Sequence, residues 1–157
     1  MYPLPWYVIL FQSFPETFLM IILGFKLFNL NIELKKVTII SLIVCVFAYF
    51  VRHLPLAFGV HTLILVLIDA ILCRAIGNIK LVYGLIGITV GALINGVLQS
   101  LLVPIMLSIG GMGISALSSE PVLNIVLFLP IGIIMLALCM VIKKCNFVLY
   151  DLSIHGK

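Results

Sequence analysis

The strongest constraint on this chain is a run of 39 residues without Asp, Glu, Lys or Arg, from Leu81 to Ser119. A second such run follows from Pro121 to Ile142. A helix of about 20 apolar residues crosses a hydrocarbon layer about 30 Å thick, so each run is long enough to do so. A 157-residue chain that is 64% hydrophobic and 9% charged cannot bury its apolar surface in one water-soluble core. The sequence therefore predicts an all-α, polytopic helical bundle in the cell membrane.

Charges, prolines and polar clusters divide the chain into about five predicted transmembrane helices. These spans cover residues 6–25, 37–51, 60–76, 81–105 and 122–142. Together they make one transmembrane domain over residues 1–142, followed by a short cytoplasmic tail over residues 143–157. The second span is short, and it crosses comfortably only if its helix continues through Arg52 and His53, whose polar side chains then reach the interface.

The Lys and Arg residues predict the orientation, because short cytoplasmic loops are enriched in them. With the N-terminus outside and the C-terminus in the cytoplasm, eight of the nine fall inside: Lys26, Lys35, Lys36, Arg74, Lys80, Lys143, Lys144 and Lys157. Only Arg52 falls outside. The net charge of +4 is then explained by topology and by anionic lipid headgroups, without a nucleic-acid partner.

In this orientation the segment RHLPLAFGVHT, residues 52–62, is an external hairpin. Pro55 stops the second helix, and Gly59 gives the backbone freedom before the third. One interpretation makes Arg52, His53 and His61 interfacial anchors and helix-start residues. The other makes them an outward-facing recognition patch, in which His responds to pH or Arg meets a ligand carboxylate.

Three stretches carry a resemblance to a known family: FPETFLMIILGFKLFNLNI, VRHLPLAFGVHTLIL, and a basic GNIK turn into a Gly-rich span. In layout, the whole chain resembles the N-terminal membrane segment of Gram-positive sensor histidine kinases. These kinases belong to the group with a GHKL-type ATPase module, which includes the accessory-gene-regulator receptors. The resemblance implies a role in two-component signal transduction.

The chain departs from that family after its last predicted span. Such kinases continue into a dimerising helix with a phospho-accepting His and an ATP-binding domain, whereas this sequence ends with KKCNFVLYDLSIHGK. His155 lies in that tail, and no nucleotide-binding motif follows it. Kinase activity is therefore not carried over. The resemblance implies a freestanding sensor-like or accessory membrane protein.

Two acidic residues fall inside predicted spans, where a charge costs from about 2.5 kcal/mol upwards. Glu16 is the eleventh residue of the first span and Asp69 the tenth of the third, so both lie at similar depth. As neighbours they could share a proton or flank a cation. Alternatively each is simply protonated or hydrogen-bonded to another helix. Pro15 removes one backbone hydrogen bond beside Glu16 and favours a kinked, polar-lined backbone there.

The fourth predicted span carries polar and small residues at spacings of three, four, four and four, which place them on one helical face. They are Gly84, Gly87, Gly91, Asn95 and Gln99. Small residues let another backbone approach, and the two amides can hydrogen-bond across the contact. We therefore expect the three glycines to pack against another helix, in this chain or in a second copy. A polar ligand pocket around the two amides is the alternative.

The remaining candidate groups indicate no catalytic function. Cys45, Cys73, Cys139 and Cys145 lack CxxC or Cys/His metal spacing. His61 and Cys73 are about 18 Å apart along one helix, too far for a catalytic pair. The external segment 108–121 is Gly- and Ser-rich, which is typical of a connector or of a ligand-gating loop.

The sequence thus predicts no enzyme, no metal site and no cofactor. Its expected function is that of a sensory or accessory signalling module, with the lipid bilayer and a membrane partner such as a kinase or a second copy. The alternative is a small transporter or channel subunit that uses Glu16 and Asp69.

Overall fold

The computed structural model describes residues 5–54, 60–113, 117 and 120–152, and every regular element within them is helical. The predicted all-α fold is confirmed. Four helices are long and apolar enough to cross a membrane: Trp6–Leu27, Leu34–His53, Leu81–Ile109 and Pro121–Cys145. They support a multi-pass membrane protein.

The first of these helices is continuous but changes its winding. It begins with α1 (Trp6–Val8), widens into the π-helical turn η1 (Ile9–Ser13) and continues as α2 (Phe14–Leu27). Pro15 has no N–H, and its ring would clash with the carbonyl group four residues earlier in a regular α-helix. A π-turn directly before the proline is a local rearrangement of that hydrogen-bond ladder.

The second long helix, α3 (Leu34–His53), extends three residues earlier and two later than the predicted span. It includes Arg52 and His53, as a full crossing requires. Leu54 is extended, with φ −77° and ψ 141°, because the residue before a proline disfavours helical backbone. Pro55 and Gly59, the predicted turn residues of the hairpin, lie outside the described residues.

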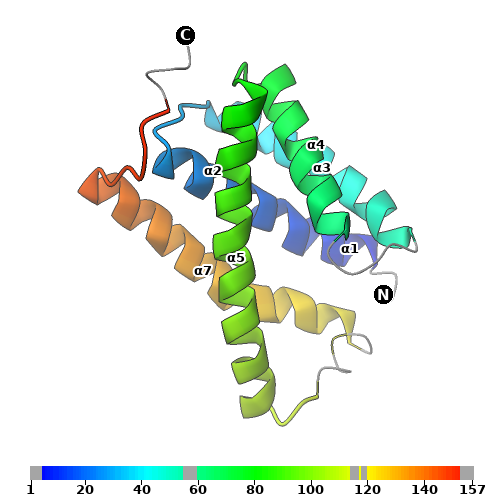
Figure 1. Ribbon diagram of the computed structural model, residues 1–157. Helices are drawn as coiled ribbons and strands as arrows, with labels where there is room; N and C mark the ends of the chain where they lie inside the picture. Colours follow the sequence, from blue (N-terminus) through cyan, green and yellow to red (C-terminus); the bar gives the residue numbers. More distant parts are fainter. Residues whose placement is uncertain (1–4, 55–59, 114–116, 118–119, 153–157) are drawn as a thin grey trace.

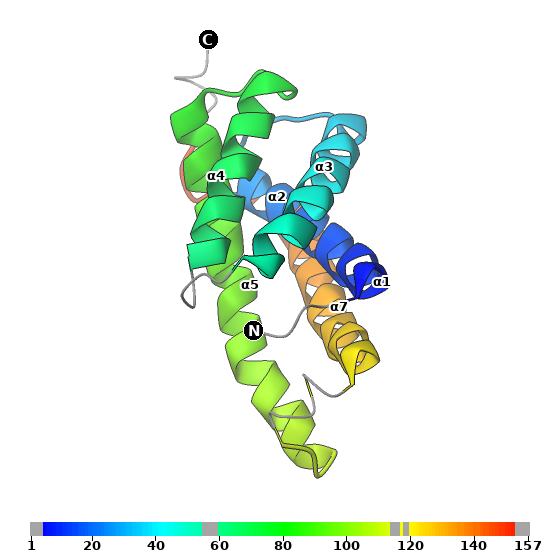
Figure 2. The same ribbon diagram turned by 90° about the vertical axis from the view of Figure 1, so that its right-hand side faces the viewer.

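The next helix, α4 (Val60–Ala75), has 16 residues and is therefore about 24 Å long. It is shorter than the four candidate spans. It nevertheless packs along α3 and α5 over its length. Figure 2 shows α3 and α4 beside each other, with α2 behind them.

Two helices contain internal prolines. The predicted fourth span, residues 81–105, includes Pro104, and α5 (Leu81–Ile109) continues through this proline to four residues beyond the end of that span. Likewise α7 (Pro121–Cys145) continues through Pro130. In lipid, backbone groups have no water to bind, so a helix that loses one bond at a proline still keeps the others. In both views the C-terminal end of α5 extends beyond the other helices (Figures 1 and 2).

The central helix of the bundle is α2, which contacts α3, α5 and α7. Its side chains Ile21, Leu23 and Phe25 are almost completely buried. The long helix α5 crosses both α2 and α7 (Figure 1). This arrangement places one face of α5 directly on α2, while α4 covers the neighbouring face.

The segment after α7 folds back onto the end of α2. Asn146 caps α7 in the left-handed conformation, with φ 47°. The Leu149 and Leu152 amides then donate to the carbonyl oxygens of Leu27 (2.7 Å) and Phe28 (3.1 Å). The helix α7 continues to Cys145, three residues beyond the end of the predicted span, and Leu152 in the segment after it is buried.

Candidate functional site

The face of α5 that carries the predicted glycines lies on α2 and α4. Gly84, Gly87 and Gly91 are all buried. A Cβ atom on Gly91 would overlap the Met20 carbonyl oxygen, and one on Gly87 would lie 2.8 Å from a ring carbon of Phe25. From the other side, a Cβ atom on Gly24 would overlap the Gly87 carbonyl oxygen. The two backbones therefore touch, and the partner helix belongs to the same chain.

The contact follows a regular register. Gly24 lies against Gly87, and Met20 lies against Gly91, so α2 and α5 run antiparallel in steps of one helical turn. The next step pairs Glu16 with Asn95 and Gln99. Asn95 Nδ2 and Gln99 Nε2 each donate to Glu16 Oε1 at 2.6 Å. One continuous helix face thus supplies both the close packing and the polar contact.

Beyond Met20 the helices separate around a cavity of about 190 Å³. Helices α2, α3, α4 and α5 and the π-turn all contribute to its wall. Its polar lining consists of Ser13, Glu16, Thr17, Arg52, Thr62, Asp69, Asn95 and Gln99. The cavity therefore brings together all four residues of the predicted intramembrane polar site, and it adds Arg52 from the predicted external patch.

The two carboxyl groups of the cavity are in different states of hydrogen bonding. Glu16 Oε1 accepts from two amides. Asp69 is only 1% exposed, and neither of its carboxylate oxygens has a hydrogen-bond partner among the described residues. Within the same part of the chain, Ser13 Oγ and Asn95 Oδ1 are also buried without a partner. Buried polar groups are normally paired, so this cluster of oxygens is exceptional.

The cavity is closed on the side of the α4–α5 turn. Within about one turn of its lining residues, each of these four helices contributes an apolar side chain that is at most 1% exposed. These are Leu23 on α2, Val44 on α3, Ala70 on α4 and Ile88 on α5. The glycine contact lies at the same level and leaves no room for a methyl group. Toward the α3–α4 hairpin the wall instead contains half-buried Arg52 and exposed Thr62.

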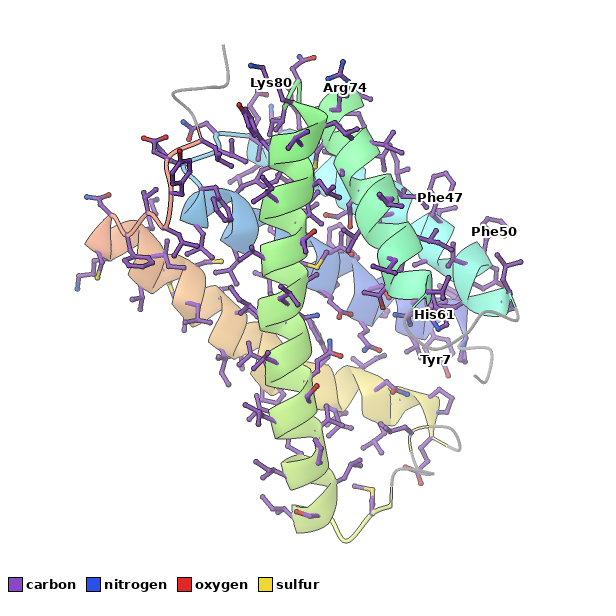
Figure 3. The ribbon with its side chains drawn as sticks, in the orientation of Figure 1. Tyr7, Phe47, Phe50, His61, Arg74 and Lys80 are labelled. Atoms are coloured by element: carbon purple, nitrogen blue, oxygen red, sulfur yellow. The ribbon has the colours of Figure 1, made fainter. Side chains whose placement is uncertain are left out.

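The structure separates the three residues of the predicted external patch. Arg52 lines the cavity. His53 is exposed, lies with Nδ1 2.6 Å from the Tyr49 carbonyl oxygen, and has its ring 4.5 Å from the Tyr49 ring. His61 is buried in the first turn of α4, at the opposite end of that helix from Arg74 (Figure 3), and it is not part of the cavity wall.

Sequence reasoning missed Gly24 in the close contact and Ser13, Thr17 and Thr62 in the cavity lining. Gly24 was not singled out, although Glu16, Met20 and Gly24 recur every four residues and so share one face of α2. Ser13 was also missed. Its position in the π-turn follows from Pro15, which the sequence did mark as a site of irregular backbone.

The cysteines lie away from this wall. Cys45, Cys73 and Cys139 are buried and Cys145 is exposed, all as free thiols. The Cys45 thiol donates to the Ile9 carbonyl oxygen in the π-turn at 3.3 Å. Within the described residues no group of three His, Cys, Asp or Glu side chains is arranged to hold a metal ion. Of the predicted loop 108–121, Ser108 belongs to α5, and Asn124 Nδ2 donates to the Leu117 carbonyl oxygen at 3.0 Å.

No family model matches this chain, and no match was found among curated proteins or solved structures.

Proposed function

We propose that this chain crosses the cell membrane five times, with its N-terminus outside and its C-terminus in the cytoplasm. Four helices meet the length and hydropathy needed for a span. The short α4 supports a fifth, because it packs against α5 from the level of Gly84 to that of the cavity. Arg74 and Lys80 lie together at one end of the bundle (Figure 3), where an excess of Lys and Arg favours the cytoplasmic side.

Cysteine accessibility tests this orientation. In a variant without native cysteines, Glu120→Cys should react with a membrane-impermeant thiol reagent in intact cells, whereas Asn78→Cys should react only after lysis. Glu120 is exposed before α7, and Asn78 lies in the α4–α5 turn, at opposite ends of α5. Labelling of residue 78 in intact cells would reject the proposed orientation.

The proposed function is that of a sensory or accessory signalling module, in which the cavity receives a small ligand from outside. The observation that carries this proposal is the one-sided shape of the cavity. Polar side chains line it toward the α3–α4 hairpin, while packed apolar residues and the glycine contact close its other end. A site that is closed on one side is suited to binding without passage. The resemblance to membrane segments of sensor kinases supports the same function and suggests a kinase as partner.

Arg52 and His53 provide a matched test, since they are adjacent but only Arg52 faces the cavity. In cells that carry the gene, we expect Arg52→Ala to reproduce the change in transcript levels caused by deleting it, at normal protein abundance. His53→Ala should behave like the wild type. Equal behaviour of the two variants, or a deletion without any transcriptional effect, would contradict the proposal.

A transporter is the second candidate, because Glu16 and Asp69 line the same cavity at mid-helix. Ion flux by the purified protein in liposomes separates the two functions. The signalling proposal predicts no flux above that of empty liposomes. Robust flux that is abolished by Asp69→Asn or Glu16→Gln would favour the transporter instead, since a neutral amide cannot release a proton or balance a cation.

A further inference from the structure

We propose that the cavity binds the primary ammonium group of a small organic molecule, with Asp69 as its counter-ion. This inference rests on the proposed function, because it names the class of ligand that the same cavity receives. It is carried by the buried oxygen atoms of the cavity that lack a donor within the described residues.

The side chains that carry these oxygens come from three elements of the fold and line the same cavity. Ser13 Oγ comes from the π-turn, both carboxylate oxygens of Asp69 from α4, and Asn95 Oδ1 from α5. The three side chains are between 1% and 6% exposed. A buried acceptor left without a hydrogen bond destabilises the fold, and more so if it is charged. A ligand that supplies several N–H donors would remove this cost at all three side chains.

Two amide donors of the cavity are already engaged. The Asn95 and Gln99 amides both donate to Glu16. Glu16 therefore has its partners within the chain, whereas Asp69 is the carboxylate left for a ligand. With Arg52 on the same wall, the formal charge of Glu16, Asp69 and Arg52 is −1, so one positive charge completes the balance.

Size and lining favour an organic ammonium ion over a bare metal ion. A water molecule occupies about 30 Å³ of liquid volume, and the cavity holds about 190 Å³. Its walls also include Met20, Leu65 and Val66, which offer apolar contact to a hydrocarbon body. An –NH₃⁺ group carries three donors, which matches an acceptor set of one carboxylate, one amide oxygen and one hydroxyl.

Propylammonium chloride and tetramethylammonium chloride test this inference on the full chain purified in detergent micelles. Both are small organic monocations, but only propylammonium has N–H donors. We expect propylammonium to raise the thermal midpoint, by about 3 °C at ten times its dissociation constant. Tetramethylammonium, sodium and potassium chloride should leave the midpoint unchanged at equal ionic strength.

Two serines supply a matched pair of variants, because both hydroxyls are buried without a partner in the described part of the chain and only Ser13 lines the cavity. Ser13→Ala should weaken propylammonium binding about tenfold, and Ser41→Ala should not change it. Asp69→Asn should weaken it about 100-fold, since the charge-assisted hydrogen bonds are lost.

Several outcomes would overturn the inference. An equal shift with tetramethylammonium or sodium would indicate a site for charge alone. A propylammonium shift that persists in Asp69→Asn would place the ligand elsewhere. No shift up to 100 mM propylammonium would show that the oxygens are satisfied by protonation or water. Each of these results concerns the ligand class only, because the Arg52→Ala phenotype in cells tests the signalling proposal separately.

Discussion

The contact between α2 and α5 has two halves that follow the same register but differ in how the helices meet. From Gly24 to Gly91 the two backbones touch, and no side chain fits between them. From Glu16 to Gln99 the helices are joined by hydrogen bonds and border a polar cavity. Packing and ligand binding were alternative interpretations of this face. The difference between the halves shows that one helix face can pack closely at one depth and line a polar cavity at another.

The largest loss of stability on substitution is expected in the closely packed half of this contact. Gly91→Ala adds a Cβ atom that overlaps the Met20 carbonyl oxygen, and backbone cannot move aside as a flexible side chain can. We expect a loss of about 3 kcal/mol in stability, or little folded protein at all. Thermal unfolding and the yield of monodisperse protein after size-exclusion chromatography measure this effect.

Gly96→Ala is the control for that substitution, since a Cβ atom there would have no neighbour within 4 Å. It lies five residues further along the same helix, so the helix propensity gained is the same, about 0.5–1 kcal/mol. Stability should be unchanged or slightly higher. An equal loss of stability in Gly91→Ala and Gly96→Ala would contradict the close contact between α2 and α5.

A smaller loss is expected in the polar half. Glu16→Ala leaves the Asn95 and Gln99 amides without their shared acceptor, which should cost about 2 kcal/mol. Glu16→Gln keeps an acceptor oxygen and should retain most of that stability. The ratio of the two losses, read from thermal midpoints, tests whether hydrogen bonding rather than charge holds this half together. If Glu16→Gln were as unstable as Glu16→Ala, the negative charge of Glu16 rather than its hydrogen bonds would stabilise this half.

The smallest change in stability is expected at Asp69, although its carboxylate is the most deeply buried. Because it has no hydrogen-bond partner in the described chain, Asp69→Asn removes no interaction. Its free energy of unfolding without ligand, measured by thermal unfolding, should equal that of the wild type or exceed it by up to about 1 kcal/mol. A clear loss of stability in Asp69→Asn would mean that Asp69, like Glu16, stabilises the fold, and would contradict this prediction.

Local patterns predicted the helices and the composition of the site because both depend on periodicity. The spacing from Gly84 to Gln99 identifies one face of a single helix without any tertiary information. The partner of that face is set by how five helical segments pack, which no local pattern specifies. The match between the two faces could still have been noticed, since Glu16, Met20 and Gly24 mirror Asn95, Gly91 and Gly87.

The predicted external patch illustrates the opposite case. Arg52 and His53 are adjacent in the sequence, but successive residues of a helix point about 100° apart. Only Arg52 turns toward the cavity, while His53 contacts Tyr49 on its own helix. The predicted span over residues 81–105 already includes Pro104, and α5 continues past this proline to Ile109 because a proline removes only one backbone hydrogen bond.

The folded-back segment after α7 fixes the C-terminal end of α2 in place. Glu16 touches the cavity near one end of this helix, and about 18 Å further along, Leu27 and Phe28 hold the segment through two backbone hydrogen bonds. Asn29 Nδ2 adds a third connection, to Asp151 Oδ2 at 2.9 Å. Three hydrogen bonds therefore join residues 149–152 to the C-terminal end of α2, so a shift of α2 along its axis would move this segment with it.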